Sequence, residues 1–450
     1  MKRGQLIEFT IEDVRFPSKG IGTFEGREIH VKNTLPGQVV EARVKKRRKE
    51  YVEAKLVRVV ERSEEEVESF CEHFGKCGGC AIQTLKYEDQ TKNKARMVEK
   101  LLENTGIEDF NFKGILSSPD IYEYRNKMEF SFGDEEKDGP LRLGMHKKGR
   151  MHDVVNVPKC HICGKDFTKI ATAVLEFAVE HNIPKYNKRT HEGFLRHLTI
   201  RKGLKTDEIL IGLSASTQYD LDYDAFVKVL LDLELEGDIV GILHILNDGQ
   251  GDVVKGPIKT LYGREYYYEE LLDLRFKVSF FSFFQTNTFG AELLYKATME
   301  HMDNIESKVV FDLFSGTGTI GQIMSKKAKH VIGIELIEDA VDAANENAKL
   351  NNITNAEFLA GDVFNMLDEV KVKPDVIVLD PPRMGILEKT LYKILRYKVK
   401  GITYVSCNPK TLAENLVQMQ KAGYKVDDVL CVDMFPHTPH VETIVKLSLK

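Results

Sequence analysis

The stretch from Val309 to Gly321, VVFDLFSGTGTIG, contains the residues that decide the fold. It begins with a short apolar run, which predicts a buried parallel strand ending at Asp312. The small residues that follow, including Gly316 and Gly318, allow a tight turn and a closely packed helix. A strand that enters a helix through such a turn is the first unit of a nucleotide-binding α/β fold. The glycine spacing alone is a weak signal, because close helix packing needs the same residues.

Regular alternation of strand and helix patterns surrounds this stretch, from about residue 273 to residue 450. The apolar runs predict parallel strands at 308–312, 330–335, 356–360, 375–379 and 402–406, and the segments VDDVLCVDMF and ETIVKLSL predict two final strands. The last strand should run antiparallel to its neighbours after a hairpin. Six or seven strands with alternating helices predict an α/β fold with a doubly wound, Rossmann-like sheet.

Two further domains are expected before this sheet. Residues 4–60 have the apolar/polar alternation of four or five short strands and predict an OB-like β-barrel in a domain spanning 1–60. The acidic stretch 61–69 has the composition of a linker, and the mixed, β-rich pattern of 118–270 predicts an α+β fold. The predicted domains are therefore 1–60, a central domain at 61–272 and a Rossmann-like domain at 273–450.

Positive charge is concentrated in the first domain and in two clusters of the central one. Residues 1–60 carry 14 Lys and Arg against 8 Asp and Glu, including the run Lys45–Lys49. This run fits a phosphate-binding patch and equally a strand edge guarded by lysines. The clusters at 146–150 and 196–202 fit RNA contacts or simply exposed loops.

Composition places the chain among ordinary soluble proteins, with 42% hydrophobic and 30% charged residues. The N-terminus has no signal-peptide core, and no apolar run approaches the roughly 18 residues of a membrane span. We therefore expect a cytoplasmic protein with no membrane partner.

Seven cysteines in a cytoplasmic chain favour metal binding or catalysis over disulfides. Cys71, Cys77 and Cys80 lie within ten residues that also contain three glycines, so three thiolates can converge on one centre. Cys160 is the natural fourth ligand, with Cys163 close by. Zinc would use pairs such as Cys77/Cys80 and Cys160/Cys163, whereas an iron–sulfur cluster takes four thiolates at irregular spacing. The alternative is a set of buried cysteines that bind no metal.

Acidic residues follow four of the predicted strands, at the sheet edge where such folds bind their ligands. They are Asp312, Glu335, Asp362 and Asp380. Glu335 can accept hydrogen bonds from both ribose hydroxyls of NAD or S-adenosylmethionine. Asp362 is placed to accept from an adenine amino group, although a helix N-cap explains that residue equally well. An acidic edge suits a cationic sulfonium better than a pyrophosphate, and Asp380-Pro-Pro-Arg makes a rigid loop beside a target base, so we favour S-adenosylmethionine.

The fifth strand delivers Cys407 to the same edge. Pro409 and the helix expected near Lys410 predict backbone N–H groups and a positive helix end beside the sulfur, which would lower its pKa. A thiolate opposite a methyl donor suggests covalent catalysis, because addition to uracil C6 makes C5 nucleophilic. Removal of the C5 proton then needs a base. Glu442, at the start of the last strand, is the candidate, although a polar residue is unremarkable at a strand start.

These motifs together resemble the RNA uracil-5-methyltransferase family, specifically its 23S rRNA type with an iron–sulfur cluster and a TRAM domain. The similarity covers nearly the whole chain and rests on the N-terminal basic module, the spaced cysteines and the motifs FFQTN, DLFSGTGTIG, GIE, DPPR, SCNP and HVET. By resemblance, Cys407 is the nucleophile and Glu442 the base. The S-adenosylmethionine site would comprise Gln285, Phe314, Glu335, Asp362 and Asp380, with Asp380 and Gln285 also near the uracil.

The resemblance also implies a [4Fe–4S] cluster held by Cys71, Cys77, Cys80 and Cys160, and a helix at about 88–112 that packs on the catalytic domain. The expected product is 5-methyluridine in a structured loop of large-subunit rRNA, made by a monomer that flips the target base. The alternatives are methylation of tRNA uridine or of an amino group, and a non-catalytic RNA-binding platform. A nicotinamide oxidoreductase would leave DPPR and SCNP unexplained. The tRNA enzymes are expected to lack the N-terminal barrel and the cysteines.

Overall fold

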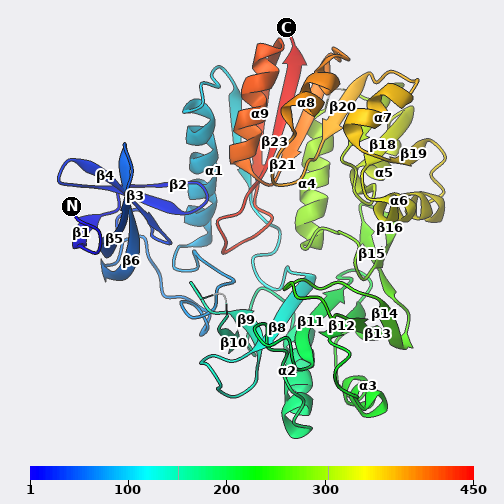
Figure 1. Cartoon of the computed structure of the whole chain (residues 1–450). Helices are drawn as coiled ribbons and strands as arrows, with labels where there is room; N and C mark the ends of the chain where they lie inside the picture. Colours follow the sequence, from blue (N-terminus) through cyan, green and yellow to red (C-terminus); the bar gives the residue numbers. More distant parts are fainter. Residues whose placement is uncertain (151, 303) are drawn as a thin grey trace.

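The computed structural model describes residues 1–150, 152–302 and 304–450. Figure 1 shows an N-terminal barrel beside α1 and a C-terminal α/β sheet above a central sheet. The C-terminal sheet has eight strands in the order β19-β18-β17-β20-β21-β23-β22-β7. Five of them are parallel and match the predicted strands within one residue at each end: β17 (Val309–Leu313), β18 (His330–Glu335), β19 (Ala356–Ala360), β20 (Val376–Leu379) and β21 (Gly401–Ser406). The predicted Rossmann-like fold is confirmed.

Alternate residues of these strands face two hydrophobic cores. Phe311 and Leu313 pack under helices of one face, whereas Val310 packs with those of the other. The first face is covered by α1 (Tyr87–Glu103), α7 (Val363–Glu369), α8 (Glu388–Leu395) and α9 (Pro409–Lys421), and the second by α4 (Thr288–His301) and α5 (Thr319–Ser325). The helix α6 (Glu338–Leu350) packs on β18 and β19. Because both faces are covered, the strands are largely apolar, and most of their polar groups lie at or next to their ends.

The last strand, β23 (Glu442–Leu449), runs antiparallel between β21 and β22 (Tyr424–Val432), as expected. In this register Thr443 is opposite Ser406. Glu442 therefore returns to the edge where Cys407 leaves β21.

The edge strand beside β22 comes from far earlier in the chain. β7 (Asn111–Leu116) pairs in parallel with β22, and α1 packs against β7 and α9. The helix expected at 88–112 ends at Glu103, and residues 111–112 already belong to β7. The C-terminal sheet is thus completed by residues that precede the central sheet and lie within the range 61–272 predicted for the central domain.

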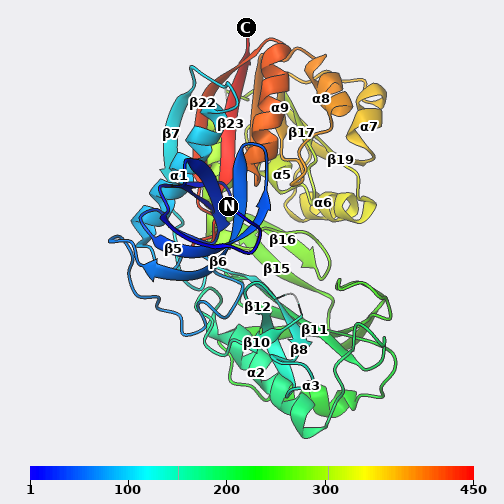
Figure 2. The same ribbon diagram turned by 60° about the vertical axis from the view of Figure 1, so that its left-hand side comes forward.

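The N-terminal barrel has six strands rather than four or five, in the order β1-β5-β6-β4-β3-β2. They are β1 (Leu6–Thr10), β2 (Asp13–Arg15), β3 (Lys19–Phe24), β4 (Arg27–Lys32), β5 (Val39–Arg47) and β6 (Tyr51–Glu61). The barrel lies beside α1 in both views (Figures 1 and 2), where Lys100 Nζ donates to Asp13 Oδ2 at 2.7 Å. The side chains of Lys45–Lys49 are exposed at the end of β5 and in the turn that follows.

The central sheet has seven strands, in the order β10-β9-β8-β11-β12-β13-β14. They are β8 (Lys127–Gly133), β9 (Arg142–His146), β10 (Val154–Asn156), β11 (Leu195–Lys202), β12 (Glu208–Ala215), β13 (Asp238–Leu246) and β14 (Ile258–Gly263). Its core packs against α2 (Lys165–Glu180) and α3 (Tyr223–Leu231). A separate hairpin, β15 (Tyr266–Leu271) and β16 (Leu274–Ser279), joins it to the C-terminal part.

The basic cluster at 196–202 is not an exposed loop. It forms β11, in which Arg196 and Arg201 are 4% and 1% exposed. Their guanidinium groups donate to backbone carbonyls, among them those of Asn247 and Phe280. These hydrogen bonds make burial of the charge tolerable, so both arginines brace loops instead of presenting charge to RNA.

None of the helices among the described residues is long and apolar enough to cross a membrane.

Candidate active site

The glycine-rich turn after β17 is held in left-handed conformations. The φ angles of Phe314, Gly316 and Gly318 are +66°, +54° and +70°, and a Cβ on Gly318 would lie 2.6 Å from the Phe358 ring. Glycine is needed at Gly318 for both reasons. The turn opens onto the carboxyl edge of the sheet, where Phe314 is half-buried.

Glu335, the last residue of β18, ties this turn to the start of α6. Its Oε2 accepts from the Gly316 N–H at 3.0 Å, and its Oε1 accepts from the Ile337 N–H at 3.0 Å. Each carboxylate oxygen keeps a second lone pair. The residue is held rigidly and can still accept hydrogen bonds from a ribose.

Asp312 lies directly beneath the turn. It is fully buried, and neither carboxyl oxygen has a side-chain partner, while the backbone N–H of Gly321 nearby lowers its pKa. Burial, followed by the neighbouring charges of Asp380 and Glu335, raises its pKa to about 7. A buried carboxyl without a partner costs free energy of folding, and such groups are concentrated at functional sites.

Asp362 and Gln285 occupy two other sides of the edge. Asp362 stands at the N-cap of α7, but its side chain makes no capping hydrogen bond and is exposed. Asp362 therefore occupies the N-cap position, as the alternative predicted, but its side chain does not cap the helix. Gln285 lies just before α4, is half-buried, and its side chain hydrogen-bonds the Tyr295 hydroxyl.

The loop after β20 is braced by the turn that carries Cys407. Asn408 Nδ2 and Thr411 Oγ1 donate to the Arg383 carbonyl at 2.8 and 3.2 Å. Asp380, the first residue of this loop, is half-buried, and burial raises its pKa to about 7. The two loops thus form one unit beside the sheet edge.

Cys407 lies near Glu442, Asp380 and Arg383, since the charges of all three act on its thiol. Burial and then the two carboxylates raise its pKa to about 11. The expectation of a lowered thiol pKa is wrong for this state. The nearby N–H groups are already used: Ser406 Oγ accepts from the Asn408 N–H at 3.1 Å, and Asn408 Oδ1 accepts from the Lys410 N–H at 3.3 Å.

Glu442 is 4% exposed, and its pKa is raised to about 8 by burial and then by Asp380, against the lowering effect of Arg383. A carboxylate with such a pKa is a stronger base near neutral pH than an ordinary glutamate. The structure therefore brings the Cys407 thiol, the Glu442 carboxyl with its raised pKa, and the carboxyls of Asp312 and Asp380 to one place.

Two residues of this site were not singled out from the sequence. Tyr295 of α4 is 5% exposed and lies among Asp380, Glu442 and Asp312, whose charges, after burial, raise its pKa. Arg383 supplies the positive charge nearest to Cys407 and Glu442. The DPPR motif marked the position of Arg383, whereas no sequence signal marked Tyr295.

The four cysteines predicted to bind a metal line a common cavity. Cys71, Cys77, Cys80 and Cys160 surround it together with His73, His161 and apolar side chains such as Met128 and Met145. Cys163 is 1% exposed and packs in the core of the central domain, outside this cavity.

Four free thiols around one apolar cavity are a donor set that fits an iron–sulfur cluster. Within residues 1–150, 152–302 and 304–450, no three His, Cys, Asp or Glu side chains converge tightly enough to hold a single metal ion. A multinuclear cluster needs its ligands further apart than one ion does.

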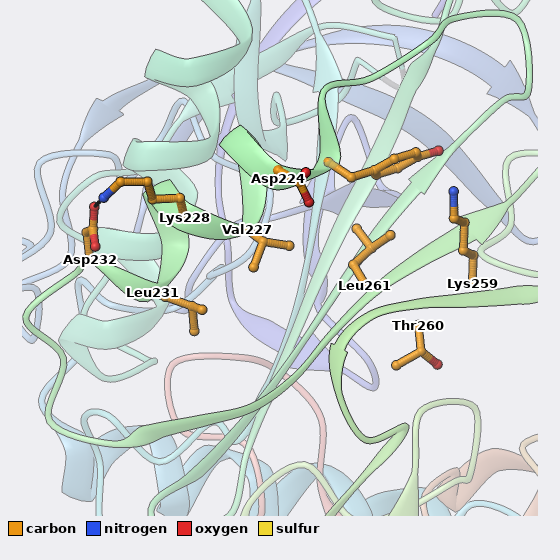
Figure 3. A pocket seen from close by; sticks show the side chains of 9 residues that line it. Asp224, Val227, Lys228, Leu231, Asp232, Lys259, Thr260 and Leu261 are labelled. Carbon is orange, nitrogen blue, oxygen red and sulfur yellow. Dashed lines mark hydrogen bonds and ion pairs between the residues drawn. The ribbon is translucent and has the colours of Figure 1, made fainter.

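A second hollow lies far from this edge, in the central domain. It is a groove of about 460 Å³ between α3 and β14, lined by Tyr223, Lys228, Lys259 and neighbouring residues (Figure 3). Lys259 Nζ lies 3.9 Å from the centroid of the Tyr223 ring, and Lys228 pairs with Asp232. None of the residues of the sheet edge reaches it.

Comparison with known proteins places the chain among RNA methyltransferases. A family model described as tRNA (Uracil-5-)-methyltransferase matches residues 86–450, and a TRAM domain model matches residues 1–57. An uncharacterized RNA methyltransferase of Clostridium acetobutylicum is 48% identical over 100% of this chain and 99% of its own length. Another, from Caldanaerobacter subterraneus, is 47% identical over 99% of both chains.

The crystal structure of the Pyrococcus abyssi tRNA (uracil-54, C5)-methyltransferase in complex with S-adenosyl-L-homocysteine is also similar. It is 28% identical, with a TM-score of 0.77, and the match covers 98% of this chain and 100% of that one. The expectation that tRNA enzymes lack the N-terminal barrel does not hold for this one, because the match covers nearly all of this chain and the whole of that one. The barrel does not distinguish the two substrate classes.

Proposed function

This chain belongs to the tRNA (uracil-5-)-methyltransferase family, and we propose that it methylates C5 of uridine, and that its substrate is 23S ribosomal RNA. As a member of this family it is an S-adenosylmethionine-dependent RNA methyltransferase with a TRAM domain. The observation that carries the proposed chemistry is the convergence of Cys407, Glu442 and Asp380 at one sheet edge. The choice of ribosomal RNA rests on the four cysteines, which resemble those of the 23S rRNA type.

In the proposed mechanism, the Cys407 thiolate adds to C6 of a flipped uracil, so that electron density moves to C5. S-adenosylmethionine supplies the methyl group and, while bound, a positive sulfonium beside the acidic edge. Glu442 then removes the proton from C5, and the electron pair released expels the Cys407 sulfur from C6. With a pKa of about 8, Glu442 is a stronger base than an ordinary glutamate once it is ionised, and only the ionised fraction, which grows as the pH rises toward 8, accepts this proton.

The cofactor site is assigned to residues at the strand ends. Glu335 would accept hydrogen bonds from the ribose, Asp362 from the adenine amino group, and Phe314 would line the same site. Asp380 and Gln285 would border both the cofactor and the uracil. Arg383, which lies beside Cys407, favours the thiolate form over the thiol.

A [4Fe–4S] cluster would be held by Cys71, Cys77, Cys80 and Cys160. We assign Cys160 rather than Cys163 as the fourth ligand, because Cys160 lines the cavity and Cys163 lies in the core behind it. Such a cluster would organise a segment with little secondary structure of its own, without a part in the methyl transfer.

Binding of RNA would combine this site with the TRAM barrel. The exposed run Lys45–Lys49 supports a phosphate-binding role that does not depend on sequence. A tRNA substrate is the second candidate, because the similar Pyrococcus abyssi enzyme acts on tRNA by its description.

The test is transfer of labelled methyl groups from S-adenosylmethionine to total RNA from cells that lack the protein. We expect label as 5-methyluridine in large-subunit rRNA, and loss of at least roughly 10⁴-fold in rate for Cys407→Ala. Label in tRNA would keep the chemistry and overturn the substrate. Full activity of Cys407→Ala would exclude covalent catalysis, and no label in any RNA would leave only a binding platform.

A further inference from the structure

The loop that leads to Glu442 is held by groups from distant parts of the chain. Residues 433–441 join β22 to β23, and most of them are buried. Lys94 Nζ donates to Asp433 Oδ1 at 2.7 Å and to the Phe435 carbonyl at 3.1 Å. The Tyr124 hydroxyl donates to the Pro436 carbonyl at 3.0 Å. Asn287 Nδ2 donates to the Met434 carbonyl at 2.9 Å.

His437 is the centre of this loop, and each of its polar groups is hydrogen-bonded. The residue is 2% exposed. Its N–H donates to Gln90 Oε1 at 2.9 Å, and its carbonyl accepts from the N–H groups of Ala81 and Ile82 at 2.9 and 3.2 Å. In the ring, Nε2 lies 2.9 Å from the Ile121 carbonyl and Nδ1 lies 3.2 Å from Gln90 Nε2.

These contacts determine the protonation of the ring. A carbonyl can only accept, so Nε2 of His437 must carry the hydrogen that it donates to Ile121. The His437 N–H can only donate, so the Gln90 oxygen faces it, and Gln90 Nε2 donates to Nδ1 and to the Leu85 carbonyl. The neutral imidazole satisfies every partner. Burial, which lowers the pKa of His437 to about 4, agrees with this assignment.

The backbone of His437 is also unusual. Its φ angle is +67°, in the left-handed region that non-glycine residues seldom adopt. In this conformation its carbonyl accepts from Ala81 and Ile82, the two residues that directly follow Cys80. The two ring hydrogen bonds hold a conformation that the backbone alone would not favour. Five residues later in the chain the loop ends at Glu442.

We propose that His437 is a positioning residue that connects the cysteine-lined segment to the catalytic base. It fixes residues 433–441 on the backbone of Ala81 and Ile82, directly after Cys80. The order of the segment that carries Cys71, Cys77 and Cys80 therefore sets the position of Glu442, and with it the rate of proton removal from C5. The inference rests on the proposed role of Glu442 as that base. It assigns to the cysteine segment an influence on one step of catalysis, beyond local folding.

The first experiment separates methyl transfer from proton removal in His437→Ala. The substrate is an RNA fragment that contains the uridine methylated by the wild-type enzyme. We expect single-turnover methyl transfer to stay within about threefold of wild type, and release of methylated RNA to slow by roughly 10- to 100-fold, because a small misplacement of a catalytic group has effects of that size. A covalent protein–RNA adduct should accumulate on denaturing gels.

His437→Gly is the matched variant, because it removes the ring and permits the left-handed backbone. It should release product faster than His437→Ala. A purely structural role predicts that methyl transfer and release fall together in both variants without an adduct, and that result would overturn the inference.

The second experiment tests the connection from the cysteine side, with hydrogen exchange instead of activity. In Cys80→Ser, amides of residues 433–441 should exchange at least roughly tenfold faster than in wild type, whereas those of β20 and β21 should not change. Met145→Leu is the control, because it changes a side chain that lines the cavity and keeps every cysteine, and it should leave exchange in the loop unchanged. Unchanged protection in Cys80→Ser would refute the connection.

Glu442→Gln distinguishes failure of the inference from failure of the proposed function. If this variant accumulates the adduct and His437→Ala does not, Glu442 is the base and only the positioning role is wrong. If Glu442→Gln releases product at the wild-type rate, the assignment of the base is itself wrong.

Discussion

The catalytic cluster (Asp312, Asp380, Cys407 and Glu442) and the cysteine cluster (Cys71, Cys77, Cys80 and Cys160) each bring four ionisable side chains from separate parts of the chain to one place. In the catalytic cluster, each residue lies at the end of a strand or one residue from it. In the cysteine cluster, residues 62–86 contain no helix or strand, and isolated bridges such as Cys77↔Lys147 connect them to the rest.

This difference determines what each side chain contributes. Backbone hydrogen bonds of the sheet fix the positions of the catalytic residues whether or not their side chains interact. The cysteine-bearing segment has few such bonds, so we expect its order to depend on the cluster that the thiols are proposed to bind. Loss of a catalytic side chain should therefore remove chemistry, whereas loss of a cysteine should remove local order.

A pair of variants, Cys77→Ala and Cys407→Ala, tests this difference between the clusters most directly. We expect Cys77→Ala to lose most bound iron and to become sensitive to proteolysis within residues 71–86, because three thiolates hold a cluster poorly. Cys407→Ala should retain iron and resist proteolysis like wild type. Iron analysis and limited proteolysis measure both. Iron-free wild-type protein that resists proteolysis in this segment would contradict the idea that bound metal orders it.

Among the changes considered, loss of the buried ion pair that holds the loop before Glu442 should lower the free energy of unfolding most. Lys94 and Asp433 form an ion pair with both side chains 0% exposed. Lys94→Met leaves the Asp433 carboxylate buried without its partner, which should cost about 3–5 kcal/mol of the free energy of unfolding. Lys94→Met combined with Asp433→Leu should recover much of that loss, because no charge remains buried. Denaturant titration measures each value.

Lys100→Met is the control for this pair. Lys100 and Asp13 have side chains 38% and 31% exposed, so breaking their ion pair should cost at most about 1 kcal/mol. An equal loss in Lys94→Met and Lys100→Met would show that burial of the ion pair does not matter here.

Within the catalytic edge, Glu335→Gln should weaken cofactor binding without unfolding the sheet. The NH₂ group of a glutamine side chain only donates, so after Glu335→Gln a single carbonyl oxygen remains to accept from Gly316, Ile337 and a ribose hydroxyl. Loss of hydrogen bonds to a charged group costs about 1.5–3 kcal/mol, or roughly 10- to 100-fold in affinity for S-adenosyl-L-homocysteine by calorimetry. Glu338→Gln, an exposed change of the same charge nearby, should bind normally. Equal affinities would separate Glu335 from the cofactor site.

The contrast between the clusters also explains what the sequence could predict. The five parallel strands and the acids at their ends follow from apolar runs and motif spacing, and the structure has them at the same sheet edge. The thiol pKa of Cys407 was mispredicted, because burial and the carboxylates of Glu442 and Asp380 raise it, while Ser406 and Asn408 take the N–H groups that were expected near the sulfur. Interactions between side chains of this kind leave no trace in spacing.

Other features depended on tertiary contacts that a single sequence does not record. Arg196 and Arg201 have the pattern of an exposed basic patch, and only the carbonyls of distant loops show that they are buried braces. Tyr295 faces the active site from a helix that has an ordinary sequence. The pairing of β7 with β22 joins residues more than 300 positions apart.

The smallest expected effect is on the pH dependence of stability in the protein without cofactor. It is expected from the buried carboxyls of the catalytic cluster. Asp312 has a pKa of about 7 when folded, raised by burial above its ordinary value of 3.8. Between these values the folded state binds a proton that the unfolded state has lost, so stability falls as pH rises from about 4 to about 7. Asp312→Asn removes this dependence. Its Tm relative to wild type should therefore rise between pH 5 and pH 7.5, by about 2–4 °C for each kcal/mol involved.

Glu442→Gln should behave like Asp312→Asn with the change extended to about pH 8, since the raised pKa of Glu442 is about 8. Differential scanning calorimetry at fixed ionic strength measures these shifts. If the Tm difference for Asp312→Asn stayed constant with pH, the buried carboxyl would already be ionised in the folded protein, and the sheet edge would have to supply positive charge that compensates it.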